Sequence, residues 1–331
     1  SNDLGRVGAR TLGWFVGAST VSLLLGLLMV NLLQPGVDAG LPLPENTSSV
    51  TTAGFTLHDF ATHLVPRSIA EAMAQNEIQQ IVVFATFVGV AAMRLENHGA
   101  SIVKLCRDIS HVMLQVTGYV MKAAPLAIFA ALAAIIATRG LDVLSAYGRF
   151  MGSFYLSLAL LWALLAAAGY LVVGPRIKTL LISLKEPTLL AFSTASSEAA
   201  FPKTLERLEQ FGVPTRIASF VLPVGYSFNL DGSMMYCTFA TMFIAQAYGI
   251  TVPLGTQLSM LMLLMVTSKG MAGVPRASLV VIAATLSTFK LPDAGLVLIL
   301  GVDQFLDMGR SATNVIRGPT WQPRRWRPRC R

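Results

Sequence analysis

Long apolar segments without a charged side chain recur along this sequence of 331 residues. Thr11–Leu33 and Phe150–Pro175 are uncharged throughout, and Ile78–Met93 is a shorter run of the same kind. A further apolar stretch, Ile109–Thr138, is broken by one lysine and one proline. A helix needs about 20 apolar residues to cross a bilayer. The four segments therefore predict four helices of an all-α polytopic membrane protein.

The composition agrees with a bilayer environment. Hydrophobic residues make up 54% of the chain and charged residues only 13%, whereas soluble domains carry about 25% charged residues. The formal net charge of +8 rests on residues 317–331, which contain six arginines and no acid. Because the rest of the chain is nearly neutral, we expect a lipid bilayer as its surroundings and no nucleic-acid partner.

The basic residues predict the orientation. They precede the first apolar run and follow the second and the fourth, whereas the connection Gln34–Glu77 contains only Arg67. By the positive-inside rule, Ser1 and the segment after Pro175 are cytoplasmic, and Gln34–Glu77 lies outside. We expect a multi-pass protein of the plasma (inner) membrane.

After Pro175 the pattern changes to interrupted segments that occur twice. An apolar arm runs into the polar tip Ser193–Ser197 and returns in a charged arm, and a second pair of arms flanks the breaker-rich tip Ser268–Pro275. Such paired interruptions are typical of transporter binding sites; a channel filter is the alternative. We predict two re-entrant hairpins, each followed by a broken or charged helix: residues 179–210 and 215–247, then 251–290 and 294–316.

Four polar side chains share one face of the last predicted helix. Asp303, Asp307, Arg310 and Asn314 are spaced i, i+4, i+7 and i+11, which places them together on a helix of 3.6 residues per turn. Charges inside a span cost about 2.5–3.5 kcal/mol each, so they face the protein interior and mark functional sites. A structural ion pair between Asp307 and Arg310 is the alternative.

These side chains suit a solute with one amine and a distal carboxylate. Arg310 offers a fork that grips a carboxylate with two parallel hydrogen bonds. Asp307 suits an ammonium group, Asn314 suits either group, and we expect Asp303 to orient Arg310.

The interruptions supply further candidate ligands. Ser196 and Ser197 at the first tip, and the second tip around Gly273, are suited to cradling a second carboxylate with backbone N–H groups. Asn229 and Asp231, beside an unwound backbone, are suited to a cation or proton site, although a helix N-cap is the simpler interpretation.

The sequence contains no candidate active site for an enzyme. The four histidines lie outside the polar half, and no Ser/His/Asp set or metal-ligand spacing is present. The three cysteines are widely separated, which argues against a cysteine metal site. We therefore expect no enzyme activity and no cofactor other than a coupling ion.

The motifs resemble the dicarboxylate/amino acid:cation symporter family, which includes bacterial glutamate–aspartate transporters. The resemblance runs from about Asp3 to Ile316 and is closest to the proton–glutamate symporters. Its most specific pieces are Ser193–Pro202, Gly225–Ser233, Ser268–Pro275 and Asp303–Asn314.

The resemblance implies a homotrimer with an elevator-type transport domain gated by the second hairpin. On this basis residues 36–147 are expected to form the scaffold and trimerisation helices, residues 1–35 and 148–316 the transport domain, and 317–331 an atypical Arg/Pro-rich tail. The family has two further helices before Ser1 and an apolar continuation after Ile316. We therefore expect a fragment with an artificial or out-of-frame tail.

The hairpin tips and the resemblance together give the expected site residues. The expected substrate contacts are Ser196, Ser197, Ser233, Gly273, Val274, Asp307, Arg310 and Asn314. The expected cation contacts are Gly225, Asn229, Asp231, Ser268, Asn314 and Ser19.

The expected function is symport of acidic amino acids with a proton or sodium ion. Asp307 favours glutamate or aspartate over C4-dicarboxylates, because a dicarboxylate has no amine to pair with it. Phe15, Ala18 and Leu230 replace residues usual in sodium-coupled members, which favours protons. A C4-dicarboxylate symporter, an anion channel and a non-functional fragment stay open as alternatives.

Overall fold

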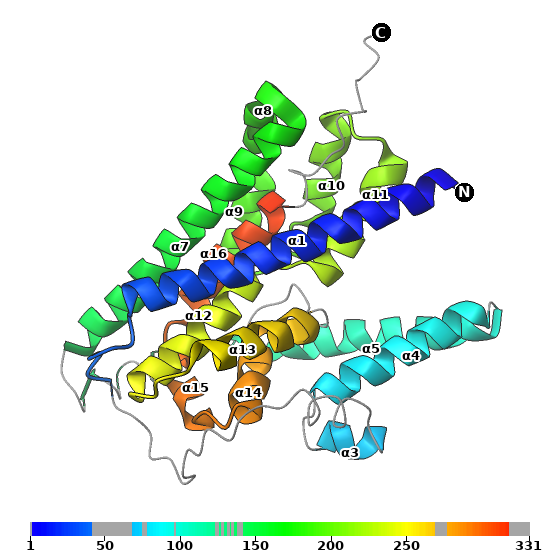
Figure 1. Ribbon diagram of the computed structural model, residues 1–331. Coiled ribbons are helices and arrows are strands. Elements are labelled where there is room, and N and C mark those ends of the chain that lie inside the picture. The colour runs from blue at the N-terminus through cyan, green and yellow to red at the C-terminus, as the bar shows by residue number, and fades with distance from the viewer. Residues whose placement is uncertain are drawn as a thin grey trace. The chain divides into compact units, whose positions relative to one another are not determined.

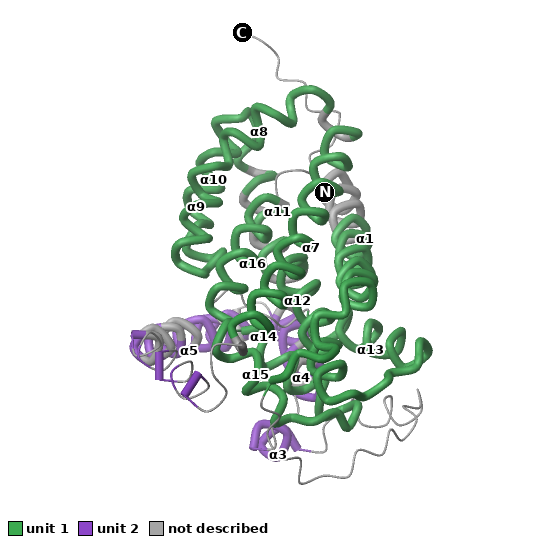
Figure 2. The backbone as a smooth tube through the Cα atoms, turned by 90° about the vertical axis from the view of Figure 1, so that its left-hand side faces the viewer, with its two compact units in different colours: residues 1–52, 142–331 green, residues 53–141 purple. Residues whose placement is uncertain are grey.

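The computed structural model describes residues 2–41, 68–74, 78–95, 97–122, 142–268 and 277–317, with isolated positions between 126 and 137. Over these ranges the regular structure is helical, without strands, which confirms the predicted all-α class. The chain forms two compact units (Figure 2): Ser1–Thr52 with Asp142–Arg331, and Ala53–Leu141. We refer to them as unit 1 and unit 2.

Unit 1 contains long helices, interrupted helices and a hairpin (Figure 1). Two long helices come first, and shorter ones follow in the polar half of the chain. In chain order they are α1 (Asn2–Leu33), α7 (Asp142–Val173), α8 (Ile177–Ser183), α9 (Lys185–Thr194), α10 (Phe201–Gln210), α11 (Thr215–Phe228), α12 (Asp231–Ala247), α13 (Leu254–Thr267), α14 (Ala277–Thr288), α15 (Leu296–Leu300) and α16 (Asp303–Arg317).

Helix α12 forms the centre of unit 1. Every side chain from Asp231 to Ala245 is buried, as expected of a helix that other helices surround. Helices α1, α7, α13, α14 and α16 all pack against it. On the α7 side, the ring of Phe150 stacks on Phe243 with centroids 4.0 Å apart. The polar start of α12 is thereby held inside the unit.

Helices α1 and α7 have the length and apolar character of membrane spans. The qualifying segments are Gly13–Leu33 and Leu144–Leu171, and each is less than half buried. Large apolar side chains on them are exposed, including Leu28, Leu32 and Leu171. Exposed apolar surface of this extent marks a contact with lipid or protein, which agrees with the predicted bilayer environment.

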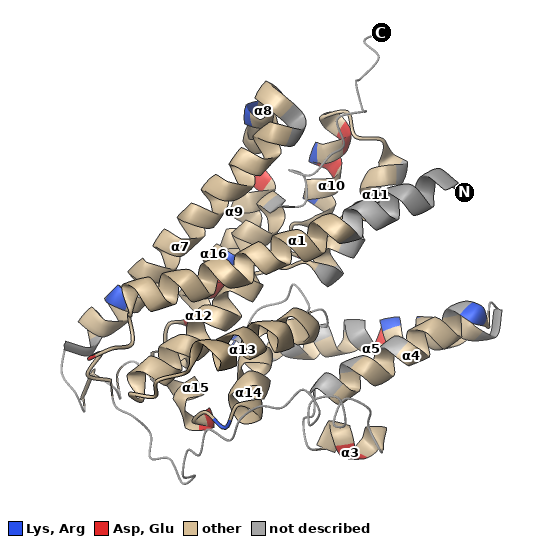
Figure 3. Ribbon diagram, in the orientation of Figure 1, with Lys and Arg blue, Asp and Glu red and all other residues tan. Residues whose placement is uncertain are grey.

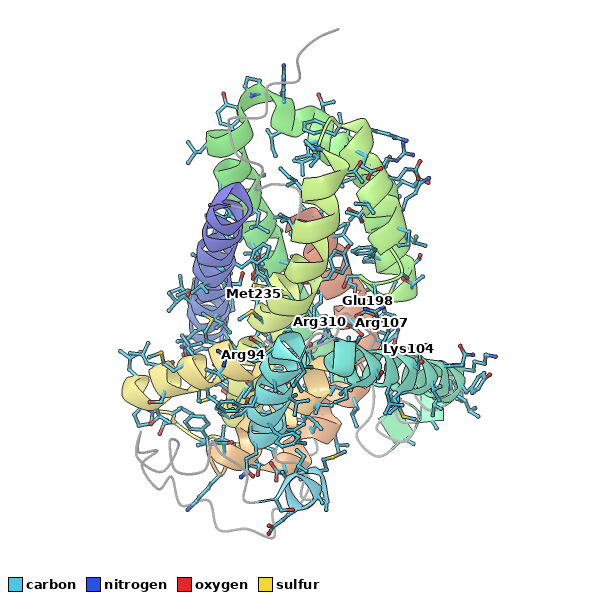
Figure 4. All side chains as sticks on the ribbon, turned by 90° about the vertical axis from the view of Figure 1, so that its right-hand side faces the viewer. Arg94, Lys104, Arg107, Glu198, Met235 and Arg310 are labelled. Atoms are coloured by element: carbon cyan, nitrogen blue, oxygen red, sulfur yellow. The ribbon has the colours of Figure 1, made fainter. Side chains whose placement is uncertain are left out.

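Glycine allows α1 to lie directly against α12. A Cβ atom at Gly26 would come within 2.7 Å of the carbonyl oxygen of Met235, a residue labelled in Figure 4. We expect Gly26→Ala to lower the free energy of unfolding by about 1–3 kcal/mol, the usual cost of overpacking. Gly17→Ala on the same helix meets open space and should be neutral or stabilising. Thermal unfolding in detergent measures the difference, and equal melting temperatures would contradict the close packing.

Unit 2 contains the described helices α3 (Ile69–Ala74), α4 (Ile78–Arg94) and α5 (Asn97–Lys122). Helix α4 packs against both of the others. The exposed side of α5 is rich in large apolar residues such as Ile102, Ile109 and Val116.

Several helix boundaries differ from those predicted. Helix α5 begins at Asn97 instead of Ile109, and α7 begins at Asp142 instead of Phe150. In both cases the helix continues through polar residues, which a search for uncharged runs excludes. The last predicted helix, 294–316, is interrupted at Gly301–Val302, directly before the charged face.

The first hairpin is present where the sequence predicts it. Helices α9 and α10 are its arms, and its tip begins at Ala195, whose φ of 49° and ψ of 32° are left-handed. Helices α13 and α14 are the arms of the second hairpin. Its tip, apart from Ser268, lies outside the described residues.

Candidate functional site

Two acids and one arginine of α16 form a buried ion-pair cluster. Nη2 of Arg310 lies 2.8 Å from Oδ1 of Asp307 and 3.2 Å from Oδ1 of Asp303. Arg310 and Asp303 are wholly buried, and Asp307 is 4% exposed. The structure therefore brings these three predicted side chains together. Burying charges is expensive even when they are paired, so stability alone does not explain the cluster.

Tyr236 of α12 completes this cluster and was not predicted from the sequence. Its hydroxyl donates to Oδ1 of Asp303 at 3.0 Å. Its ring lies under the guanidinium of Arg310, with the centroid 3.9 Å from Cζ, a cation–π arrangement. The sequence signal for Tyr236 was its spacing of three residues from Ser233, which places the two side chains on one face of a helix.

The guanidinium of Arg310 (labelled in Figure 4) keeps two nitrogens for a ligand. Nε and Nη1 are buried, and neither has a hydrogen-bond partner among the described residues. Buried donors without acceptors are rare and call for an explanation. Since Tyr236 covers the face of the guanidinium and acids occupy Nη2, the N–H donors of Nε and Nη1, which point in different directions, are the parts suited to a carboxylate oxygen.

Asn314 joins α16 to the start of α12. Its Oδ1 accepts from the backbone N–H of Gly232 at 3.0 Å, and its Nδ2 donates to Oγ of Ser233 at 3.2 Å. A Cβ atom at Gly232 would lie 2.7 Å from the carbonyl oxygen of Arg310, so this close approach requires glycine. Two predicted substrate residues, Ser233 and Asn314, are thereby held beside the ion-pair cluster.

The first hairpin packs along the same helix. Helix α9 lies against α16, and Ala191, Ala200 and Val315 form a buried apolar contact between them. At the tip, Ser197 is buried and its hydroxyl has no partner among the described residues. Oγ of Ser196 accepts a hydrogen bond from the N–H of Ala199 at 3.4 Å.

A second polar group surrounds the break between α11 and α12. The side-chain amide of Asn229 places one terminal atom 2.6 Å from Oδ1 of Asp231, 2.6 Å from Oγ of Ser19 and 3.3 Å from the carbonyl oxygen of Phe15. Because the atoms around it are acceptors, this atom is assigned as the amide nitrogen, whose two hydrogens are shared among the three oxygens. The oxygens of Asp231, Ser19 and Phe15 thus converge on one point, as they would around a hard cation.

The other predicted cation residues are less informative. The carbonyl oxygen of Gly225 accepts from the N–H of Asn229 at 3.0 Å. Ser268 is buried, and its hydroxyl lacks a partner among the described residues. Gly273 and Val274 lie outside the described residues.

Interrupted helices that gather charged side chains inside a helical unit are typical of secondary transporters. The chain belongs to the sodium:dicarboxylate symporter family, which matches residues 1–318. This membership confirms the resemblance seen in the sequence motifs, and it assigns the chain to a class of transporters rather than to a class of enzymes.

Three relatives illustrate the similarity. The C4-dicarboxylate transport protein of Laribacter hongkongensis (strain HLHK9) is 38% identical, covering 95% of this chain and 73% of that protein. The proton/sodium-glutamate symport protein of Geobacillus stearothermophilus is 37% identical, with 95% and 76% covered. The proton/glutamate-aspartate symporter of Escherichia coli (strain K12) is 37% identical, with 96% and 75% covered.

Proposed function

We propose that this chain is a secondary active symporter that couples uptake of glutamate or aspartate to a proton or sodium gradient. Arg310 carries this proposal, because its two unpartnered buried nitrogens offer a carboxylate site beside Asp307. In the proposed complex, Arg310 holds the side-chain carboxylate and Asp307 holds the ammonium group of the substrate.

The remaining contacts belong to the same proposal. Asp303 and Tyr236 orient Arg310, and Asn314 holds the start of α12. The proposed substrate contacts are Ser196, Ser197, Ser233, Gly273, Val274, Asp307, Arg310 and Asn314, and the proposed cation contacts are Gly225, Asn229, Asp231, Ser268, Asn314 and Ser19.

A C4-dicarboxylate symporter is the second candidate. A relative with 38% identity is named a C4-dicarboxylate transport protein, and a dicarboxylate would also use the free N–H donors of Arg310. Asp307 argues against it, because a second carboxylate placed there would meet a buried acid instead of an ammonium partner.

Uptake into proteoliposomes tests the proposal. We expect accumulation of radiolabelled aspartate above equilibrium when an inward proton or sodium gradient is imposed, and competition by glutamate stronger than by succinate. Separate gradients identify the coupling ion. Flux that ignores both gradients would indicate a channel, and preference for succinate would favour the second candidate.

The oxygens that converge at Asn229 predict an effect on cation coupling that is separate from substrate binding. We expect Ser19→Ala to raise the half-saturating concentration of the coupling cation by roughly tenfold, since a lost hydrogen-bonding ligand to a charge costs about 1.5–3 kcal/mol. Aspartate affinity at saturating cation should change little. Ser22→Ala is the matched control, because Ser22 is buried on the same helix and its hydroxyl has no partner among the described residues. Equal effects of both variants would contradict the site.

Assembly and location complete the proposal. We propose a homotrimer in the plasma (inner) membrane, with residues 36–147 as scaffold and residues 1–35 and 148–316 as transport domain, as the resemblance to the family implies. The described residues of both candidate sites all lie in unit 1, which supports movement of substrate and cation together.

A further inference from the structure

The base of the first hairpin carries a surface cavity that the substrate site does not use. Its volume is about 390 Å³, and it lies where α8 gives way to α9, beside α10. Figure 3 shows that charged residues occur on the ribbon at α8 and α10. The lining combines charged and apolar residues: Ile182, Ser183, Lys185, Glu186, Leu189 and Arg207.

Positive charge exceeds negative charge in this cavity. Its one acid, Glu186, is ion-paired with Arg207 and, at 3.4 Å, with Lys203. The pKa of Glu186 is lowered, chiefly by the hydrogen bond from Arg207, so its charge is present and already neutralised. Lys185 has no ion-pair partner in the described part of the chain, and Nε of Arg207 is buried without an acceptor there. Helix α9 begins at Lys185, which adds the positive end of a helix dipole.

The apolar part of the lining faces outward. Ile182 is 72% exposed and Leu189 is 56% exposed, and both adjoin the basic groups in the same cavity. Such side chains are favourable against an acyl chain and unfavourable against water. The predicted orientation places this end of unit 1 on the cytoplasmic side, where a membrane surface carries anionic lipids.

We propose that this cavity binds one anionic phospholipid. Lys185, Arg207 and the start of α9 hold its phosphate, and Ile182 and Leu189 contact its acyl chain. A lipid bound there contacts both arms of the first hairpin, so the lipid composition of the bilayer acts on the transporter away from the substrate site.

Quenching by brominated lipid tests the proposal. Leu189→Trp places a fluorescent reporter at an exposed position of the cavity, and the protein is reconstituted in phosphatidylcholine vesicles with brominated phosphatidylglycerol or brominated phosphatidylcholine. We expect the apparent affinity for phosphatidylglycerol to exceed that for phosphatidylcholine by at least about fivefold, the effect of one basic group near a membrane surface. Adding Lys185→Ala should remove most of this preference.

Lys203→Ala is the matched control, because Lys203 lies in the same charged network but does not line the cavity. It should leave the preference within about twofold of the reporter protein. An equal loss with Lys203→Ala, or no loss with Lys185→Ala, would overturn the proposal. Displacement by glycerol phosphate, which lacks acyl chains, would overturn the acyl-chain contact. Native mass spectrometry gives a second measurement that does not depend on the reporter. It compares the phosphatidylglycerol retained by the protein without the tryptophan reporter and by its Lys185→Ala variant.

Discussion

Arg310→Lys should abolish concentrative uptake of aspartate, with a loss of at least about 100-fold in transport efficiency. Lysine keeps the positive charge between Asp303 and Asp307, so neither acid is left buried without a counter-ion. It cannot replace the planar guanidinium, whose free Nε and Nη1 hold N–H donors in fixed directions and are the donors proposed for the carboxylate. Two charge-assisted hydrogen bonds at about 1.5–3 kcal/mol each are sufficient for this effect.

A second arginine provides the control for this result. Arg207 also pairs with an acid, Glu186, but belongs to the base of the first hairpin. Arg207→Lys keeps the positive charge proposed for the lipid phosphate and lies outside the substrate site, so it should leave aspartate uptake within about twofold of the parent protein. Initial rates over a range of aspartate concentrations, normalised to the amount of folded protein, measure both variants. Normal uptake by Arg310→Lys would show that the carboxylate does not bind this guanidinium.

The sequence predicted the charged face of α16 because helical periodicity is a local property. The spacing of Asp303, Asp307, Arg310 and Asn314 requires only that the segment be helical, and burial follows from the cost of charge in an apolar environment. The interruption at Gly301–Val302 could not be predicted in the same way. The predicted span runs through these residues, and the sequence pattern gave no sign that the helix stops directly before its charges.

Partners from other helices were harder to predict. Tyr236 reaches Arg310 only because α12 packs against α16, and Ser19 reaches Asn229 across 210 positions of sequence. A single sequence contains the periodicity of each helix but not the pairing between helices. The prediction of helix ends from uncharged runs was also wrong at polar residues. The twelve residues before Ile109 belong to α5 although they include charges.

The balance of charge at Arg310 shows why a zwitterionic substrate fits this site. Asp303 and Asp307 contribute two negative charges against one positive charge, and Tyr236 adds only the weakly negative face of its ring. A carboxylate bound to Arg310 alone would leave excess negative charge in a buried place. An ammonium group beside Asp307 offsets the charge of that carboxylate, because opposite charges at short range favour the ionised forms of both.

Asp307→Asn should therefore separate amino acids from dicarboxylates. Asparagine has nearly the same shape as aspartate but no charge, so the ammonium group of aspartate would be buried without its counter-ion. Breaking a buried pair costs about 3–5 kcal/mol, and we expect aspartate uptake to fall by at least about 100-fold. Succinate has no ammonium group, and its uptake should fall by less than about tenfold or should rise, because Arg310 loses a competing acid.

Asp303→Asn is the matched control, since Asp303 also pairs with Arg310 but accepts a hydrogen bond from Tyr236. Loss of the Asp303 charge should disturb the orientation of Arg310 and lower the uptake of both substrates to a similar extent. The ratio of aspartate to succinate uptake should therefore stay near that of the parent protein. Competition between the two substrates in the same vesicles measures this ratio directly. If Asp307→Asn lowers the uptake of both substrates equally, then Asp307 serves only to hold Arg310, and recognition of the amine must come from another part of the site.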